Sequence, residues 1–312
     1  MRENCEVVIL CGANSPERSV SLRSGRNVAA LLKGIMPLRL IELQENIMPT
    51  DLDPRRSIIF PLVHGDFGED GKLQKMLDGG NFVYIGSGNE SMELTIDKAR
   101  TKNLLASFAI PTLPHRTFRW NGTCDVSLEK IFNDIGGGLF FKPNCGGSSI
   151  DCFRCDEVGR CASTLEKIGR RVEWIVEPFC GECVDITVAL LHGKALAAMM
   201  LRHSGDFLDF NGKYSADGAK HLCPAPIGDA LTEQLFSCAE RAFLLCGCRD
   251  WARVDFLLDG SGDFFFLEVN GVPGFTETSF FPDCAIASDL GAVECLKSLL
   301  EPALRRHRSL YR

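Results

Sequence analysis

A predicted β-hairpin within residues 251–279 carries side chains that could bind a metal. Two apolar runs flank residues 259–262, Asp-Gly-Ser-Gly, which is a turn composition. The strand period of two places four polar residues on one face: Arg253, Asp255, Glu268 and Asn270. Two carboxylates and an amide offer oxygen ligands that suit Mg2+, which bridges to substrate phosphates. The alternative is an ordinary hairpin with one solvated face.

The register expected for this hairpin follows from its turn. Leu258 is expected to pair with Asp263, which places Asp255 opposite Phe266. A metal at this face would need a phosphate-bearing ligand, so the rest of the chain must supply a site for one.

A glycine- and serine-rich loop follows another predicted strand. The segment 140–150 reads FFKPNCGGSSI, with Lys142 in the strand and residues 146–149 in the loop. Backbone N–H groups and hydroxyls of such a loop can surround a phosphate, although it lacks the GxxxxGK[ST] pattern of Walker-type loops. For an isolated GGSS sequence, a hairpin turn would be the simpler interpretation.

A long polar segment, residues 204–222, interrupts the later strands. Its composition is that of a loop, yet it contains Lys213 and Tyr214. Cationic and aromatic groups in a loop suit a lid that closes over a site. A solvated connector is the alternative.

The N-terminal third alternates predicted strands and helices. A strand at Glu6–Cys11 precedes a helix for which Ser15-Pro16 is the expected start, and further strands are expected near residues 38–43, 58–63 and 82–85. This alternation predicts a small parallel sheet, whose ligands lie beyond the carboxyl ends of its strands. Glu17 and His64 lie at those ends. The alternatives are a helix-dipole acid and a turn histidine.

The remaining chain predicts further elements that would position these groups. A helix begins at Asp97 and ends by Ile110-Pro111, and strands are expected at residues 172–179, 184–191 and 194–200. Long helices are expected at residues 229–246 and 290–300.

The overall composition is that of an ordinary globular protein. The 312 residues are 45% hydrophobic and 24% charged, and suit two or three packed units. The net charge of −7 argues against general nucleic-acid binding, which requires a basic face. No apolar run is long enough to span a bilayer, so no membrane association and a cytoplasmic location are expected.

Fifteen cysteines include two CxxC pairs, Cys152/Cys155 and Cys180/Cys183. A zinc site is one interpretation. Random placement would give about 0.7 such pairs, so two pairs are weak evidence. We expect buried thiols that pack as small hydrophobic groups.

Seven motifs, in this order, resemble the D-alanine–D-alanine ligases of the ATP-grasp superfamily. They are SPERSVSLRSG, HGDFGEDGKLQ, IGSG with DKARTK, FKPNCGGSS, KYSAD, RVDFLL and LEVNGVPGFTETSFFP. The resemblance implies an α/β fold, α+β in its ATP-binding part, with a parallel N-terminal domain before the ATP-grasp. It implies three units: an N-terminal substrate domain over residues 1–98, a central ATP-grasp subdomain with the phosphate loop over 99–180, and a C-terminal subdomain with the closing loop and metal site over 181–312.

The resemblance also implies a nucleotide site. Asp255, Glu268 and Asn270 match the family's ligands for two Mg2+ ions, which Mn2+ could replace. Lys98 and Lys142 match lysines that hold the ATP phosphates, and Lys213 matches the lysine of the closing loop. Glu177 matches the adenine-binding linker and Asp185 the acid that holds the ribose.

On the amino-acid side, Glu17 matches the acid that receives the ammonium of the first D-alanine, and His64 matches a histidine of that subsite. Ser148 and Tyr214 match a set hydrogen-bonded with Glu17. Arg253 and the backbone of Gly274 match groups that stabilise the tetrahedral intermediate. Ser279 matches the residue that binds the carboxylate of the second substrate.

The implied reaction joins two D-alanines through an acyl phosphate, with ATP as phosphoryl donor, for peptidoglycan precursor synthesis. Two alternatives are an ATP-grasp ligase that joins other amino acids and an ATP-binding regulatory protein without activity. The family is usually dimeric, so a homodimer is expected. The chain departs from the family pattern at Cys145, at Ile150-Asp151 and at Leu208 of the closing loop, and none of these residues is a catalytic group.

Overall fold

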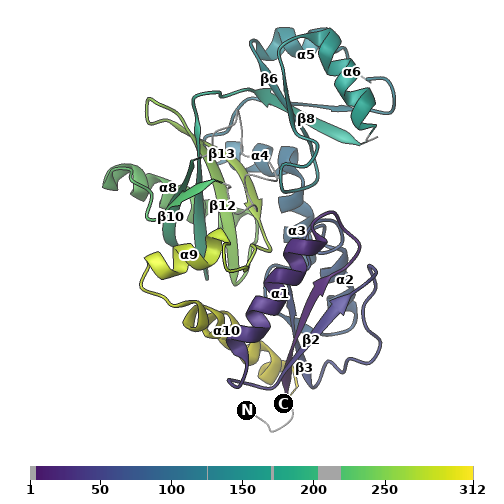
Figure 1. The fold of residues 1–312 in the computed structure, drawn as a ribbon, viewed down its shortest axis with the longest axis vertical. Helices are drawn as coiled ribbons and strands as arrows, with labels where there is room; N and C mark the ends of the chain where they lie inside the picture. The colour runs from purple at the N-terminus through teal and green to yellow at the C-terminus, as the bar shows by residue number, and fades with distance from the viewer. Residues whose placement is uncertain (1–4, 125, 170–171, 203–218, 312) are drawn as a thin grey trace.

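The computed structural model describes residues 5–124, 126–169, 172–202 and 219–311. Three sheets are arranged along the long axis of the molecule, with the N-terminal sheet at one end, the central sheet at the other and the C-terminal sheet between them (Figure 1). The two ends of the described chain lie close together at the N-terminal end (Figure 1).

The N-terminal sheet is fully parallel, in the order β2-β1-β3-β4. Its elements are β1 (Glu6–Gly12), α1 (Arg18–Leu32), β2 (Leu38–Leu43), β3 (Ser57–Pro61), α2 (Lys72–Gly79) and β4 (Val83–Tyr84). Every residue of β3 is buried, as expected of a strand covered on both faces. Helix α1 begins at Arg18, so the predicted start at Ser15-Pro16 was wrong by two residues. The Ser15 hydroxyl still accepts a hydrogen bond from the backbone N–H of Glu17 and donates one to the His64 carbonyl.

The central sheet is antiparallel, in the order β5-β8-β6-β7. Its elements are β5 (Arg116–Arg119), α5 (Leu128–Ile135), β6 (Leu139–Pro143), β7 (Phe153–Cys155), α6 (Val158–Ile168) and β8 (Glu173–Pro178). A separate apolar core lies between this sheet and its two helices, with Phe141 and Trp174 at its centre. This unit therefore has a small core of its own.

The C-terminal sheet is antiparallel, in the order β11-β10-β9-β12-β13. Its elements are β9 (Val184–Leu191), β10 (Lys194–Arg202), β11 (Lys220–Leu222), α8 (Asp229–Leu245), β12 (Trp251–Leu258) and β13 (Phe264–Asn270). One face packs against α8. The other face contributes Leu191 and Trp251 to the core that it shares with the N-terminal unit.

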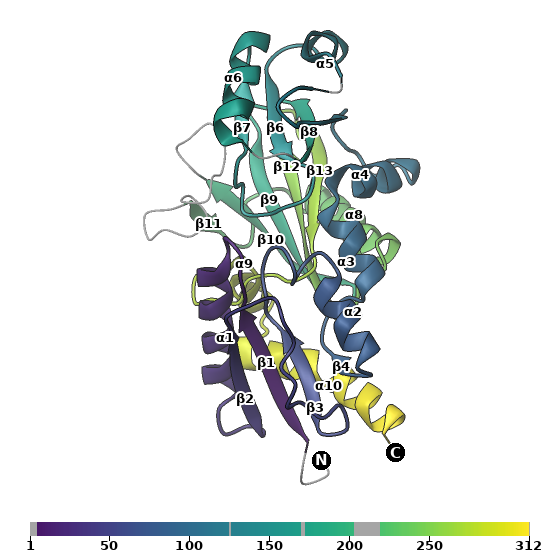
Figure 2. The same cartoon turned by 90° about the vertical axis from the view of Figure 1, so that its right-hand side faces the viewer.

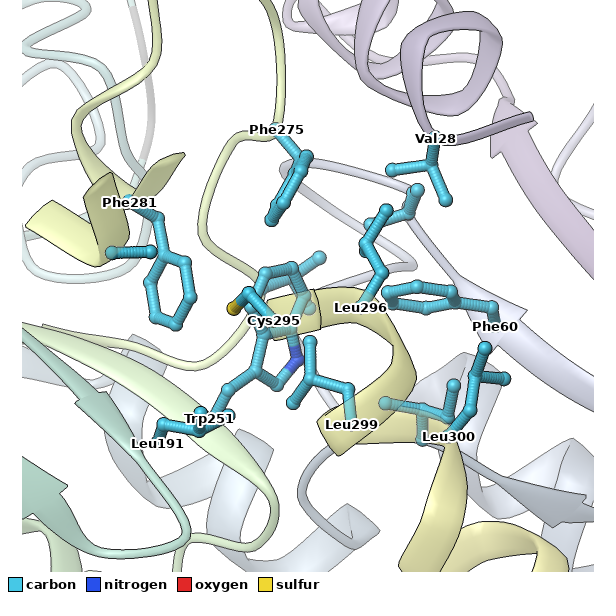
Figure 3. Packing of buried hydrophobic residues seen from close by; sticks show 14 of the residues in the cluster. Val28, Phe60, Leu191, Trp251, Phe275, Phe281, Cys295, Leu296, Leu299 and Leu300 are labelled. Carbon is cyan, nitrogen blue, oxygen red and sulfur yellow. The ribbon is translucent and has the colours of Figure 1, made fainter. Parts of the chain in front are cut away.

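Four further helices join the units: α3 (Asn89–Ile96), α4 (Lys98–Ser107), α9 (Phe280–Ala287) and α10 (Ala292–Leu310). Figure 2 shows α2, α3 and α4 in succession along one side of the molecule. Helix α10 is longer than predicted and packs back against the N-terminal sheet. In the core between the units, Leu296 and Leu300 of α10 lie near Phe60 of β3, and Trp251 meets Phe60 and Phe281 edge to face (Figure 3).

The expected fold class, a parallel N-terminal α/β unit followed by an α+β part, is confirmed, and the two sheets of the α+β part are antiparallel. None of the helices in the described part of the chain is both long and apolar enough to cross a bilayer.

Candidate active site

The two candidate residues of the N-terminal unit are buried beside the rest of the site. Glu17 lies at the N-cap position of α1, but its side chain caps nothing there. Instead it turns toward the phosphate loop, where the Ser148 hydroxyl donates a hydrogen bond to it. His64 follows β3, and its Nε2 lies 3.4 Å from the Ser24 hydroxyl. Burial, reinforced by the charge of Arg253, lowers the pKa of His64 to about 4, so the imidazole is neutral near pH 7.

A second buried carboxylate, Glu69, lies in the same cavity as Glu17. The backbone N–H of Gly65 donates to it over 2.6 Å. Burial, with the neighbouring charge of Glu17, raises the pKa of Glu69 well above its usual range. Sequence reasoning missed this residue. Its signal was the HGDFGEDG motif, in which the backbone N–H of Gly65, at φ +73°, reaches an acid four residues later.

The four polar residues of the β12–β13 hairpin lie on one face, as predicted, but the predicted register was wrong. Leu258 pairs with Phe264 rather than Asp263, and a bulge then places Asp255 opposite Glu268 and Arg253 opposite Asn270. The guanidinium of Arg253 donates to both oxygens of Asp255, each at 2.9 Å.

Two neighbours complete the surroundings of these carboxylates. The hydroxyl of Thr187, on β9, donates to Asp255 over 2.5 Å. The ammonium of Lys98 lies 3.3 Å from Glu268 and donates to the Gly146 carbonyl of the phosphate loop over 2.5 Å. Lys98 therefore joins the metal-ligand candidates to the glycine- and serine-rich loop at residues 146–149, the predicted phosphate loop.

The adenine-linker candidate, Glu177 of β8, lies between two lysines. Its carboxylate oxygens are 2.5 Å from the ammonium of Lys142, on β6, and 2.6 Å from that of Lys102, on α4. Burial would raise the pKa of Glu177, but the two ammonium groups outweigh it and lower that pKa to about 2. Lys102 was missed in the sequence, although its spacing of four from Lys98 places both on one face of α4.

Two cavities collect most of the predicted site residues and meet at Lys98 and Glu268. The larger lies between the central and C-terminal sheets, and the candidates that line it are Lys98, Lys142, Glu177, Asp185, Asp255 and Glu268. The smaller faces the N-terminal unit, and the candidates that line it are Glu17, Lys98, Ser148, Arg253, Glu268 and Asn270. Apolar residues such as Phe140, Phe179 and Leu267 complete the larger cavity, as is typical of a small-molecule site.

Three candidates lie near these cavities without lining them. His64, Gly274 and Ser279 are all absent from the two walls in the described part of the chain. The Ser279 hydroxyl accepts a hydrogen bond from the backbone N–H of Thr276 over 2.8 Å. Gly274 is packed so closely that an added Cβ would lie 2.9 Å from that hydroxyl. Lys213 and Tyr214, with Leu208, lie outside the described residues.

The residues proposed for magnesium fit that ion by their chemistry. Asp255, Glu268 and Asn270 supply hard oxygen donors from paired strands, and Mg2+ needs only one or two carboxylates when substrate phosphates complete its shell. In the described residues, no group of three or more His, Cys, Asp or Glu side chains forms an independent metal site.

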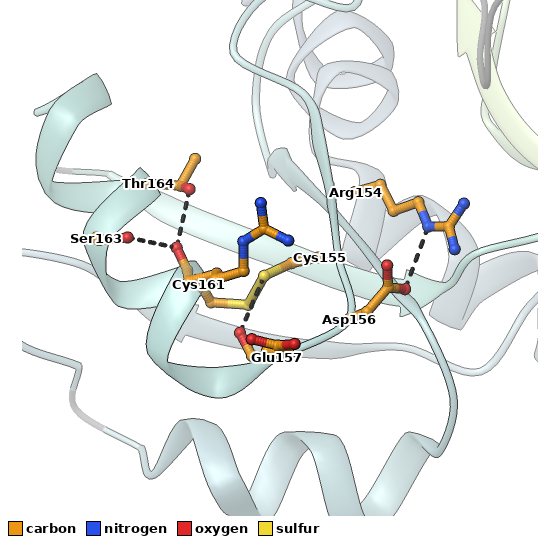
Figure 4. The surroundings of a disulfide bond; sticks show 8 residues. Arg154, Cys155, Asp156, Glu157, Cys161, Ser163 and Thr164 are labelled. Atoms are coloured by element: carbon orange, nitrogen blue, oxygen red, sulfur yellow. Dashed lines mark hydrogen bonds and ion pairs between the residues drawn. A yellow bond between two sulfur atoms is a disulfide. The ribbon is translucent and has the colours of Figure 1, made fainter.

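Among the residues that the structure describes, no cysteines take part in a candidate metal-binding group. The structure pairs Cys155 with Cys161 and Cys180 with Cys183 as disulfides, which corrects the expectation that all cysteines are thiols. Figure 4 shows the first of these joining the end of β7 to the first turn of α6. The second lies in the linker between β8 and β9, and both its cysteines line the larger cavity. Within each pair the two Cα atoms lie close enough for a disulfide, 5.9 Å apart in Cys155–Cys161 and 5.4 Å apart in Cys180–Cys183.

Comparisons with known proteins identify the family of this chain. A family model described as the D-ala D-ala ligase C-terminus matches residues 104–301. The D-alanine--D-alanine ligase of Alcanivorax borkumensis is 36% identical over 97% of this chain and 95% of its own length. The chain belongs to the D-alanine–D-alanine ligase family.

Other members of the family cover the chain equally well. The D-alanine--D-alanine ligase of Actinobacillus succinogenes is 31% identical over 95% of this chain and 97% of its own. The crystal structure of the Bacillus anthracis D-alanine--D-alanine ligase complexed with ATP superimposes with a TM-score of 0.84 at 24% identity, over 98% of this chain and 99% of that one. The Coxiella burnetii enzyme gives the same TM-score at 23% identity, over 99% of this chain and 96% of that one. The D-alanine–D-alanine ligase fold therefore extends over nearly the whole chain.

Proposed function

We propose that this protein uses ATP to join two D-alanine molecules into D-alanyl-D-alanine, a peptidoglycan precursor. The observation that supports this is the meeting of two different cavities at Lys98 and Glu268. The larger is lined by ammonium groups and apolar residues and suits a nucleotide. The smaller contains the carboxylates Glu17 and Glu69 and suits an amino-acid ammonium. A phosphoryl group bound at the junction would lie next to both.

In the first step, the carboxylate of the first D-alanine attacks the γ-phosphoryl group of ATP, giving an acyl phosphate and ADP. Glu17 holds the ammonium of that D-alanine in the smaller cavity. Lys98 and Lys142 neutralise the charge that spreads over the transferring phosphoryl oxygens, which is the main way proteins catalyse this chemistry. Mg2+, when held by Asp255, Glu268 and Asn270, would supply further charge neutralisation on the phosphates.

In the second step, the amine of the second D-alanine attacks the acyl carbonyl and inorganic phosphate leaves. The carbonyl oxygen becomes an oxyanion, for which Arg253 and the backbone N–H of Gly274 are the proposed donors. Ser279, at the start of α9, is the proposed partner of the second carboxylate. Exclusion of water matters because water would hydrolyse the acyl phosphate.

A direct assay tests this function. The purified protein is incubated with ATP, Mg2+ and single D-amino acids, and phosphate release and product mass are followed. Phosphate release with D-alanine, together with the mass of the dipeptide, is the expected result. Release only with other amino acids would mean that the pocket is built for a different substrate, and nucleotide binding without turnover would mean that no ligase activity remains. A homodimer is part of the proposal and is tested by sedimentation equilibrium.

A further inference from the structure

Lys102 is a fully buried lysine behind the nucleotide cavity. Its side chain is 0% exposed, and its ammonium lies 2.6 Å from Glu177, donates to the Phe266 carbonyl over 2.7 Å, and stands 5.6 Å from the centre of the Phe266 ring. These partners come from β8 and β13, so one ammonium joins α4 to both sheets that enclose the cavity. Lys102 itself does not line the cavity.

Glu177 has two counter-ions with different surroundings. Lys142 lies 2.5 Å from one of its oxygens and lines the cavity, whereas Lys102 holds the other oxygen from the protein interior. Both lysines are therefore engaged with one carboxylate, and only Lys142 can reach a ligand. Burial disfavours the charge on Lys142, but the Glu177 carboxylate outweighs it and raises the Lys142 pKa.

Lys142 has two partners in the proposed function, the buried carboxylate of Glu177 and the phosphates. Lys142 is needed at the phosphates in the proposed function, yet it is also a partner of a buried carboxylate. If Lys142 were the sole counter-ion, its movement to a phosphate would leave an uncompensated charge in the interior, which is strongly unfavourable. The ammonium of Lys102, on the other oxygen of Glu177, would compensate that charge. Burial lowers the pKa of Lys102, and the charge of Glu177 opposes this effect.

We infer that Lys102 is a positioning residue for the nucleotide: it is the permanent counter-ion of Glu177 and leaves Lys142 available to the phosphates. This rests on the proposed function, in which Glu177 faces the base and Lys142 the phosphates. It predicts that loss of the Lys102 charge weakens phosphate binding, although Lys102 itself cannot touch a phosphate. Base binding, in contrast, should change little, because Glu177 keeps Lys142 as its partner.

Binding of ADP and of adenosine to the full-length protein, measured by isothermal titration calorimetry with Mg2+ present, tests this. The ratio of the adenosine Kd to the ADP Kd gives the affinity that the phosphates add. In Lys102→Met this ratio should fall about tenfold or more, while the Kd of adenosine changes less than about threefold. In turnover, the KM for ATP should rise and the KM for D-alanine should not. Lys130→Met, at an exposed lysine on α5 of the central unit, is the matched control.

A double variant separates positioning from a purely structural role. In Lys102→Met/Glu177→Gln there is no carboxylate to hold Lys142, so the ratio should return to within about threefold of the wild-type value. If Lys102 had only a structural role, the ratio of the adenosine Kd to the ADP Kd would be as low in the double variant as in Lys102→Met. If the double variant fails to recover the ratio, or if Lys102→Met keeps it, the inference is overturned.

Two outcomes remain: a Lys102→Met variant that fails to fold, and a wild type that shows no preference for ADP over adenosine. If Lys102→Met does not fold by circular dichroism, Lys102→Gln takes its place, with the same expected ratio. If the wild type itself binds ADP no better than adenosine, Lys142 does not hold phosphates, and both this inference and the proposed nucleotide site are wrong. If the wild type binds ADP much more tightly than adenosine and Lys102→Met does so to the same extent, only the role of Lys102 is wrong and the proposed nucleotide site stands.

Discussion

Replacing Glu17 by glutamine should selectively weaken binding of the first D-alanine. Glutamine has the same shape and can still accept the hydrogen bond that the Ser148 hydroxyl donates to Glu17. It removes only the negative charge, at a side chain that is 7% exposed. The expected effect is therefore the loss of a charge-assisted hydrogen bond to an ammonium group, while the neighbouring contacts remain.

The size of the effect follows from the surroundings of Glu17. Hydrogen bonds to charged groups contribute about 1.5–3 kcal/mol, and each 1.4 kcal/mol corresponds to about a factor of ten in affinity. The KM for the first D-alanine should then rise roughly 10- to 150-fold. The KM for ATP should stay within about twofold of the wild-type value, because Glu17 lines the smaller cavity and not the larger one.

Initial rates of ADP release give both constants, with D-alanine titrated at saturating ATP and then ATP at saturating D-alanine. The dependence on D-alanine is fitted with separate constants for the two subsites. Ser148→Ala is the matched comparison, since it removes the hydrogen bond and keeps the charge. An unchanged D-alanine constant in Glu17→Gln, or an equal rise in the constants for D-alanine and ATP, would refute the assignment of Glu17 to the ammonium.

Three further predictions concern the metal site, pH and stability. Glu268→Gln should abolish turnover by weakening Mg2+ binding, and near-normal rates at saturating Mg2+ would refute the metal assignment. The pKa of His64 is lowered from 6.5 to about 4 in the folded protein, so stability should fall by on the order of 3 kcal/mol as the pH drops from 6.5 to 4; urea unfolding should show less of this loss in His64→Gln. Arg306→Met removes a side chain that donates to both oxygens of buried Asp250, at 3.0 and 2.7 Å, and should cost about 3 kcal/mol in urea unfolding. Adding Asp250→Asn to Arg306→Met should recover part of that loss of stability, because the buried charge is then removed. Equal stability of Arg306→Met and Arg306→Met/Asp250→Asn would contradict this explanation.

Local sequence patterns predicted the elements of this protein well, because most of them depend on short-range rules. The helix expected to begin at Asp97 has Asp97 as its N-cap, whose side chain accepts from the backbone N–H of Arg100. The β9–β10 hairpin turns at His192-Gly193, where both residues adopt positive φ. In these cases the residues that define the element lie within it.

Contacts between distant segments could not be read from such patterns. Glu17 and Ser148 are 131 positions apart, and at the sequence level each had an equally good local explanation. Lys102 looked like one of several charged residues on a helix, and nothing within α4 reveals that β8 and β13 enclose it. The disulfides are different, because they are local, at separations of six and three residues; the CxxC spacing marked Cys180/Cys183 but pointed to Cys152 rather than Cys161 as the neighbour of Cys155.

The β12–β13 hairpin shows how a correct face can result from an incorrect register. With Leu258 opposite Phe264, an unbroken ladder would place Glu268 opposite Val254, on the face turned away from Asp255. The bulge at Leu267 adds one residue to β13 and returns Glu268 to the face of Asp255. The Asp259 side chain helps set this register, because it accepts from the backbone N–H groups of Ser261 and Asp263 and so fixes a longer turn. The polar face of the site therefore depends on a bulge that alternation alone does not predict, and deletion of Leu267 should turn Glu268 away from Asp255 while both strands remain.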